Sequence, residues 1–130
     1  MFTPGNTILI QIQDFGTWQF VKPKHEFLQV YQFKFDDHED PNLKTNIAPD
    51  QADQIARILT LAYEQGVNVV VHCHAGLCRS GAVAEVGIMM GFDEVHKNRQ
   101  PNVLVKNRLR KSLGLETDYA DIFKGYDEQS

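Results

Sequence analysis

A chain of 130 residues, 42% hydrophobic and 23% charged, has the size and composition of one globular domain spanning residues 1–130. No apolar run approaches the roughly 18 residues that a membrane helix needs, so no membrane partner is expected. The net charge of −4 disfavours a nucleic-acid binder. Because no secretory signal is recognisable, we expect a cytoplasmic protein. Its two cysteines, five positions apart, cannot staple a fold.

The first half of the chain predicts two strands and a helix. Residues 6–13 (NTILIQIQ) alternate apolar and polar side chains, which predicts a half-buried strand. Residues 27–35 (FLQVYQFKF) are rich in aromatic and branched side chains and predict a second strand, followed by a polar loop at 36–42 (DDHEDPN). A helix is expected from near Pro49 to Gly66. Its apolar face would consist of Ile55, Ile58, Leu59 and Ala62.

The second half predicts one more strand and two helices. Residues 67–72 (VNVVVH) are nearly all branched, which indicates a central strand buried on both faces. Residues 80–91 and 102–113 have apolar side chains at helical spacing. This order of elements predicts an α/β fold with a small, mostly parallel central sheet flanked by helices on both sides.

The segment HCHAGLCRSG, residues 72–81, gathers both cysteines, two histidines and an arginine between a strand and a helix. A tight loop around Gly76 that enters a helix can turn its backbone N–H groups inward and bind an anion. Cys73, at the mouth of such a loop, would be stabilised as a thiolate and is the natural nucleophile. Arg79 can grip two oxygens of a phosphate, and Ser80 can donate a hydrogen bond to the sulfur. The set describes phosphoryl transfer to cysteine, which needs no metal or other cofactor.

These residues match a known signature. HCHAGLCRS has the His-Cys-x5-Arg-Ser/Thr pattern of the cysteine-based protein tyrosine phosphatases, and the chain resembles the small dual-specificity type, particularly the compact enzymes of bacteria and their phages. The resemblance implies that the Cys73 thiolate attacks phosphorus while an aspartic acid protonates the leaving alcohol. The same aspartate then activates water to hydrolyse the phosphocysteine. It also implies that His72 tunes Cys73 through hydrogen bonds, and that the phosphate-binding loop consists of His74, Ala75, Gly76, Leu77, Cys78 and Arg79.

The acid is expected on the segment FKFDDHEDPN, residues 33–42, where Asp37 lies 73 − 37 = 36 positions before the nucleophile. The family that this chain resembles commonly places its acid some thirty to forty residues upstream. The segment resembles FEDHNPP of lipid-phosphatase relatives, in which the aspartate before the histidine is the acid. Carried over, this gives Asp37, with Asp36 as the second candidate and Asp40 or Glu39 after it. Further along, Asn102 resembles a recurrent Pro-Asn of related phosphatases, and a helix N-cap is its simpler interpretation.

The second cysteine, Cys78, has two interpretations. Low-molecular-weight tyrosine phosphatases carry a cysteine at this place, so a reversible, protective Cys73–Cys78 disulfide is one hypothesis. An inert small residue is the other. A zinc site formed by residues 72, 73, 74 and 78 is disfavoured, because three consecutive side chains do not readily converge on one tetrahedral ion. The low-molecular-weight branch is itself disfavoured, since its nucleophile lies near the N-terminus and Cys73 is central.

The substrate is expected to be a phosphorylated protein or peptide. The loop lacks the lysines of relatives that hydrolyse phosphoinositides, and the chain is too short for the recognition loops of large tyrosine-specific enzymes. A shallow pocket would admit phosphoserine and phosphothreonine beside phosphotyrosine. The alternatives are a phosphoinositide, an RNA 5′ end, a metabolite, or a phosphate-binding module without catalysis. Decayed phosphatases often lose the cysteine or the arginine, and this chain has both.

Overall fold

The computed structural model describes residues 4–16, 19–20, 22–40, 42–73, 79–92 and 101–115. The three strands pair in parallel, in the order β2-β1-β3. The α/β class and the small parallel sheet are therefore confirmed. In chain order the elements are the 3-10 turn η1 (Pro4–Asn6), β1 (Thr7–Gln13), β2 (Gln29–Lys34), α1 (Pro49–Gln65), β3 (Asn68–His72), α2 (Arg79–Met90) and α3 (Val103–Ser112).

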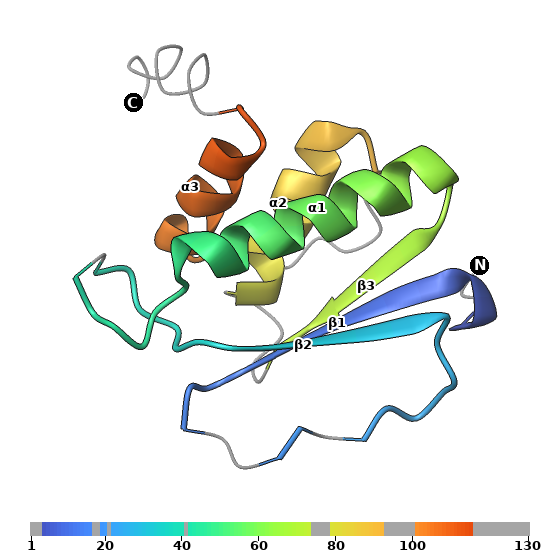
Figure 1. The fold of residues 1–130 in the computed structure, drawn as a ribbon, viewed down its shortest axis with the longest axis horizontal. Helices are drawn as coiled ribbons and strands as arrows, with labels where there is room; N and C mark the ends of the chain where they lie inside the picture. Colours follow the sequence, from blue (N-terminus) through green and yellow to red (C-terminus); the bar gives the residue numbers. More distant parts are fainter. Residues whose placement is uncertain are drawn as a thin grey trace.

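All three helices lie on one face of the sheet, and the connection from β1 to β2 runs along the other face (Figure 1). Among the described residues no helix covers this second face, which differs from the expected helices on both sides. The even-numbered isoleucines of β1 point toward the helices and form the core with them. None of the described helices is long and apolar enough to cross a bilayer.

The central strand is β1, and the prediction that residues 67–72 form the centre of the sheet is wrong. β3 lies at one edge, and its side chains are half-buried or exposed. In β1, by contrast, the polar residues Thr7 and Gln11 are buried as fully as their apolar neighbours. Gln11 tolerates burial because its Oε1 accepts a hydrogen bond from Nε2 of Gln32 on β2, at 3.1 Å. The alternating sequence of β1 predicted that its polar side chains would face solvent, and the structure buries Thr7 and Gln11.

The helices follow the predicted pattern closely. α1 begins at Pro49 and ends before Gly66, whose φ of 70° lies in the left-handed region that favours glycine. The predicted apolar positions of the three helices pack into one core. Its buried members include Ile55, Ile58, Leu59 and Ala62 of α1, Val83 and Val86 of α2, and Val105 and Leu109 of α3.

Candidate active site

A polar or reactive side chain follows each of the three strands. Asp14 comes directly after β1, Asp36 and Asp37 follow β2 after one intervening residue, and Cys73 comes directly after β3. Because the strands are parallel, their carboxyl ends meet at one edge of the sheet. Ligands of open α/β sheets usually bind at this edge. The topology thus brings together residues that are up to 59 positions apart in the sequence.

Cys73 faces the N-terminus of α2. Its side chain is 1% exposed, and its Sγ lies 3.4 Å from the backbone nitrogen of Ser80 and 3.2 Å from Ser80 Oγ. Ser80 is the second residue of α2, so the sulfur accepts an N–H of the first helical turn that has no acceptor within the helix. Helix N-termini favour negative charge, and here the favoured charge is that of a thiolate.

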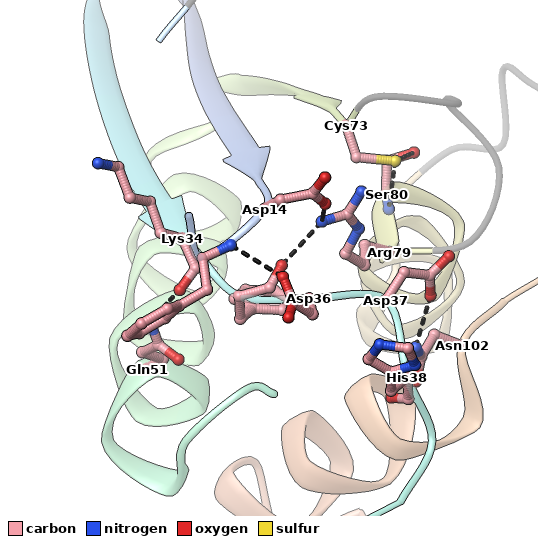
Figure 2. Close-up of polar contacts among 12 residues, drawn as sticks. Asp14, Lys34, Asp36, Asp37, His38, Gln51, Cys73, Arg79, Ser80 and Asn102 are labelled. Carbon is pink, nitrogen blue, oxygen red and sulfur yellow. Dashed lines mark hydrogen bonds and ion pairs between the residues drawn. The ribbon is translucent and has the colours of Figure 1, made fainter. Parts of the chain in front are cut away.

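Arg79, the first residue of α2, is buried (4% exposed) and connects the ends of β1 and β2. Its Nη1 donates hydrogen bonds to Asp14 Oδ1 at 2.9 Å and to the carbonyl oxygen of Phe35 at 2.7 Å (Figure 2). Its Nε is buried and has no hydrogen-bond partner among the described residues. The residue after Arg79, Ser80, contacts the sulfur of Cys73, so the backbone of Arg79 lies next to the cysteine.

Asp14 was not singled out from the sequence, although a signal for it exists. The even-numbered residues Ile8, Ile10 and Ile12 point toward the helices. Continuing this alternation by one step places Asp14 on the same face, at the edge where the nucleophile and Arg79 lie. Only the partner of its carboxylate, Arg79, required the structure.

Asp36 points toward the end of β1. Its Oδ1 accepts a hydrogen bond from the backbone N–H of Phe15 at 2.9 Å, and its own backbone N–H donates to the carbonyl of Thr45 at 2.8 Å. The Phe15 N–H, followed by the Thr45 side chain, lowers the pKa of Asp36 below the ordinary 3.8. These contacts make Asp36 a structural carboxylate, and they disfavour it as a group that must carry a proton near neutral pH.

Asp37 is exposed and points toward α3 instead. Its Oδ1 accepts a 2.6 Å hydrogen bond from Nδ2 of Asn102, which also donates to the carbonyl of His38 at 3.0 Å (Figure 2). Asn102 is 2% exposed, and its own Oδ1 accepts the N–H of Val105 at 3.1 Å. The N-cap interpretation of Asn102 is therefore confirmed, and the same side chain has a second task. It ties the loop that carries Asp37 to the start of α3.

The two remaining acidic candidates make local contacts. Glu39 Oε2 accepts the backbone N–H of Val103 at 2.8 Å, which adds a second tie to α3. Asp40 Oδ1 accepts the N–H of Asn42 at 2.9 Å, within the loop itself. Both side chains help to hold the shape of the loop, and the assignment of the acid to Asp37 stays a prediction.

The other predicted site residues divide into one that is described and five that are not. His72 is exposed, and it pairs in register with Gln11 on the face of β1 that points away from the helices. Its tuning of Cys73 stays a prediction. His74, Ala75, Gly76, Leu77 and Cys78 lie outside the described residues, and with them the phosphate-binding loop, the disulfide hypothesis and the zinc alternative.

Comparison with known proteins gives matches at the level of structure. No protein-family model matches the sequence, and neither does any curated protein. The human tyrosine phosphatase-like serine/threonine/tyrosine-interacting protein is 20% identical, with a TM-score of 0.57 over 92% of this chain and 80% of that one. A mouse putative dual specificity phosphatase, solved with zinc tungstate, is 16% identical, with a TM-score of 0.59 over 90% of this chain and 75% of that one. Both likenesses concern the fold, so the chemistry rests on the residues of this chain.

Proposed function

We propose that this chain, which has the fold of the dual-specificity members of the cysteine-based tyrosine phosphatase superfamily, is a metal-independent phosphatase that works through a phosphocysteine on Cys73. One observation carries the proposal. The buried sulfur of Cys73 meets an N–H at the start of α2, and the neighbouring residue in that helix is a buried arginine. A nucleophile, N–H donors and a guanidinium at one point are the requirements of phosphoryl transfer by positioning and charge stabilisation.

In the first step the Cys73 thiolate attacks phosphorus, the S–P bond forms, and the bond to the leaving oxygen breaks. Arg79 balances the charge on the phosphoryl oxygens. Asp37 donates its proton to the leaving oxygen, so an alcohol departs. Because Asn102 engages Oδ1 of Asp37, Oδ2 is the oxygen that carries this proton.

In the second step water attacks the phosphocysteine, and Asp37, now a carboxylate, accepts the proton of that water. The S–P bond breaks, inorganic phosphate forms, and the sulfur leaves as a thiolate. The Ser80 hydroxyl, 3.2 Å from Sγ, can donate a hydrogen bond to this sulfur as its charge returns. The residues needed for both steps thus come from β3, α2 and the loop after β2.

The proposed substrate is a phosphorylated protein or peptide, with phosphotyrosine preferred and phosphoserine or phosphothreonine accepted. Three carboxylates, those of Asp14, Asp37 and Glu39, lie at this edge of the sheet or on the loop beside it. They repel polyanions, which supports a singly phosphorylated side chain over a phosphoinositide. We propose that hydrolysis takes place in the cytoplasm.

The second candidate is a phosphate-binding module without turnover, because one of the structural neighbours described above is named as a phosphatase-like interacting protein. Hydrolysis of p-nitrophenyl phosphate near pH 6, with a chelator and a thiol present, separates the two. We expect turnover by the wild type and a loss of about 10⁴-fold or more in Cys73→Ser. Turnover that survives in Cys73→Ser would overturn the mechanism. A folded wild type that binds tungstate without turnover would establish the binding module.

A further inference from the structure

Arg79 offers an incomplete set of hydrogen bonds. A guanidinium has five N–H groups, one on Nε and two on each terminal nitrogen. The two on Nη1 are matched by two acceptors, Asp14 Oδ1 and the Phe35 carbonyl. Nε is buried and has no partner among the described residues, and no described residue is recorded as a partner of Nη2. Buried donors are nearly always satisfied, so the Nε side of the group is the side left for a ligand.

The two acceptors also fix how the guanidinium is turned. The group is planar, and a swing about its long axis would break both bonds to Nη1 at once. Nη1 is held against the ends of β1 and β2. The edge formed by Nε and Nη2 therefore faces away from these two acceptors. Two parallel N–H groups on one edge are what bidentate binding of a phosphate requires. Figure 2 shows the guanidinium between Asp14 on one side and the Cys73–Ser80 pair on the other.

We infer that Asp14 is a positioning residue for oxyanion binding, which acts through Arg79 and does not itself touch the substrate. The inference rests on the proposed function and adds a residue to its site. Asp14 is suited to positioning Arg79 because its backbone directly follows the central strand. The side chain of Arg79 is 5% exposed, so the ion pair between the two is restrained by the surrounding protein. The Phe35 carbonyl alone would leave one Nη1 hydrogen unmatched and the plane of the guanidinium poorly determined.

The sign of the effect distinguishes positioning from simple electrostatics. A carboxylate near an anion site repels the anion, so removing its charge should tighten anion binding if repulsion is all that Asp14 contributes. If Asp14 instead positions Arg79, its removal weakens binding. The side chain of Asp14 is 61% exposed, so Asp14→Ala opens no cavity and should fold, although one Nη1 hydrogen of the buried guanidinium then loses its acceptor.

The experiment measures the affinity of the whole chain for tungstate, a tetrahedral oxyanion, by calorimetry. We expect Asp14→Ala to weaken tungstate binding by about tenfold, with Asp14→Asn in between because its oxygen can still accept a hydrogen bond. The matched control is Asp53→Ala, which removes an exposed carboxylate of α1 that accepts a hydrogen bond from Ser112 of α3, and should change the affinity less than about twofold. Equal or tighter tungstate binding by Asp14→Ala would overturn the inference.

A double mutant tests whether Asp14 acts through Arg79. In an Arg79→Lys background no planar group remains to be turned, so adding Asp14→Ala should no longer weaken tungstate binding. An unchanged tenfold weakening in that background would contradict the inference. Because binding is measured apart from turnover, the two proposals fail separately. Asp14-dependent binding without turnover would remove only the proposed function, and turnover with Asp14-independent binding would remove only the inference.

Discussion

The N-termini of α2 and α3 lie close to the same edge of the sheet and are used differently. At α2 an N–H of the first turn, that of Ser80, points at the sulfur of Cys73. At α3 the corresponding N–H groups of Val103 and Val105 are taken by side chains of the protein, Glu39 and Asn102. The start of α2 therefore faces the cysteine, whereas the start of α3 is capped by side chains and holds the acidic loop.

In the proposed mechanism, this difference aligns the nucleophile and the acid without direct contact between them. α2 and α3 pack side by side, and Lys106 of α3 forms a 3.0 Å ion pair with Glu85 of α2. Asn102 then transmits the position of α3 to Asp37 through one short hydrogen bond. The spacing between sulfur and acid is thus set by the packing of two helices. The predictions below test each end of this arrangement.

The largest effect is expected at the acid. Asp37→Asn removes the proton that the leaving oxygen needs, so kcat should fall by about 10²–10³-fold with a phosphoserine peptide. The loss should be smaller with p-nitrophenyl phosphate, because p-nitrophenolate leaves without a proton. Initial rates with both substrates measure the difference.

Asp36→Asn is the matched control, since it changes the adjacent carboxylate in the same way. It should cost kcat less than about tenfold, because Asp36 holds Phe15 and not the leaving group. A larger loss in Asp36→Asn than in Asp37→Asn would assign the acid to Asp36 and refute the role given to Asn102.

An intermediate effect is expected at Asn102, which ties the acidic loop to α3. Asn102→Ala removes both the N-cap of α3 and the tie to Asp37, so it should lower the free energy of unfolding by about 1–2 kcal/mol and kcat by about tenfold. Asn102→Ser keeps an oxygen that can cap the helix and lacks the amide that reaches Asp37. It should recover stability more than activity. Urea unfolding and kcat measure the two, and equal recovery of both would show that Asn102 acts only as a cap.

The smallest effect concerns Asp36 and pH. Its pKa is lowered in the folded protein by the Phe15 N–H and the Thr45 side chain, so the folded state favours the carboxylate. The resulting stabilisation is present above the ordinary pKa of 3.8 and is lost as the pH falls through the lower, folded value. Asp36→Asn should therefore be slightly less stable than the wild type at pH 6, and the gap should close toward pH 3. Urea midpoints at both pH values measure this, and a gap that widens with acid would contradict it.

The sequence predicted the helices and strands well, and it predicted the order of the strands in the sheet less well. Periodicity placed the three helices, because burial of one helix face leaves a local pattern. The order of the strands in the sheet leaves no such local pattern in the sequence. The branched run at 67–72 lies at the edge of the sheet, and the alternating strand β1 is its buried centre. The polar side chain of Gln11 in β1 can be buried because it forms a hydrogen bond with Gln32 and not with solvent.

The same limit applies to the site. Cys73 and Arg79 share a short motif, and the pair is recognisable from the sequence alone. The partners that orient the site come from other strands and helices. Asp14 meets Arg79, and Asn102 meets Asp37, only after the chain has folded. Local patterns identified the candidate reacting groups, and tertiary structure identified the side chains that contact them.

Both of these orienting contacts join residues 65 positions apart, which is half the length of the chain. Contacts between such distant segments carry a large loop-closure cost and form only when the chain collapses into its final topology. A partly folded chain therefore contains Cys73 and Arg79 without the contacts that orient Arg79 and Asp37. In the proposed mechanism, turnover then requires the complete fold, so a nascent or damaged copy of the protein would be inactive.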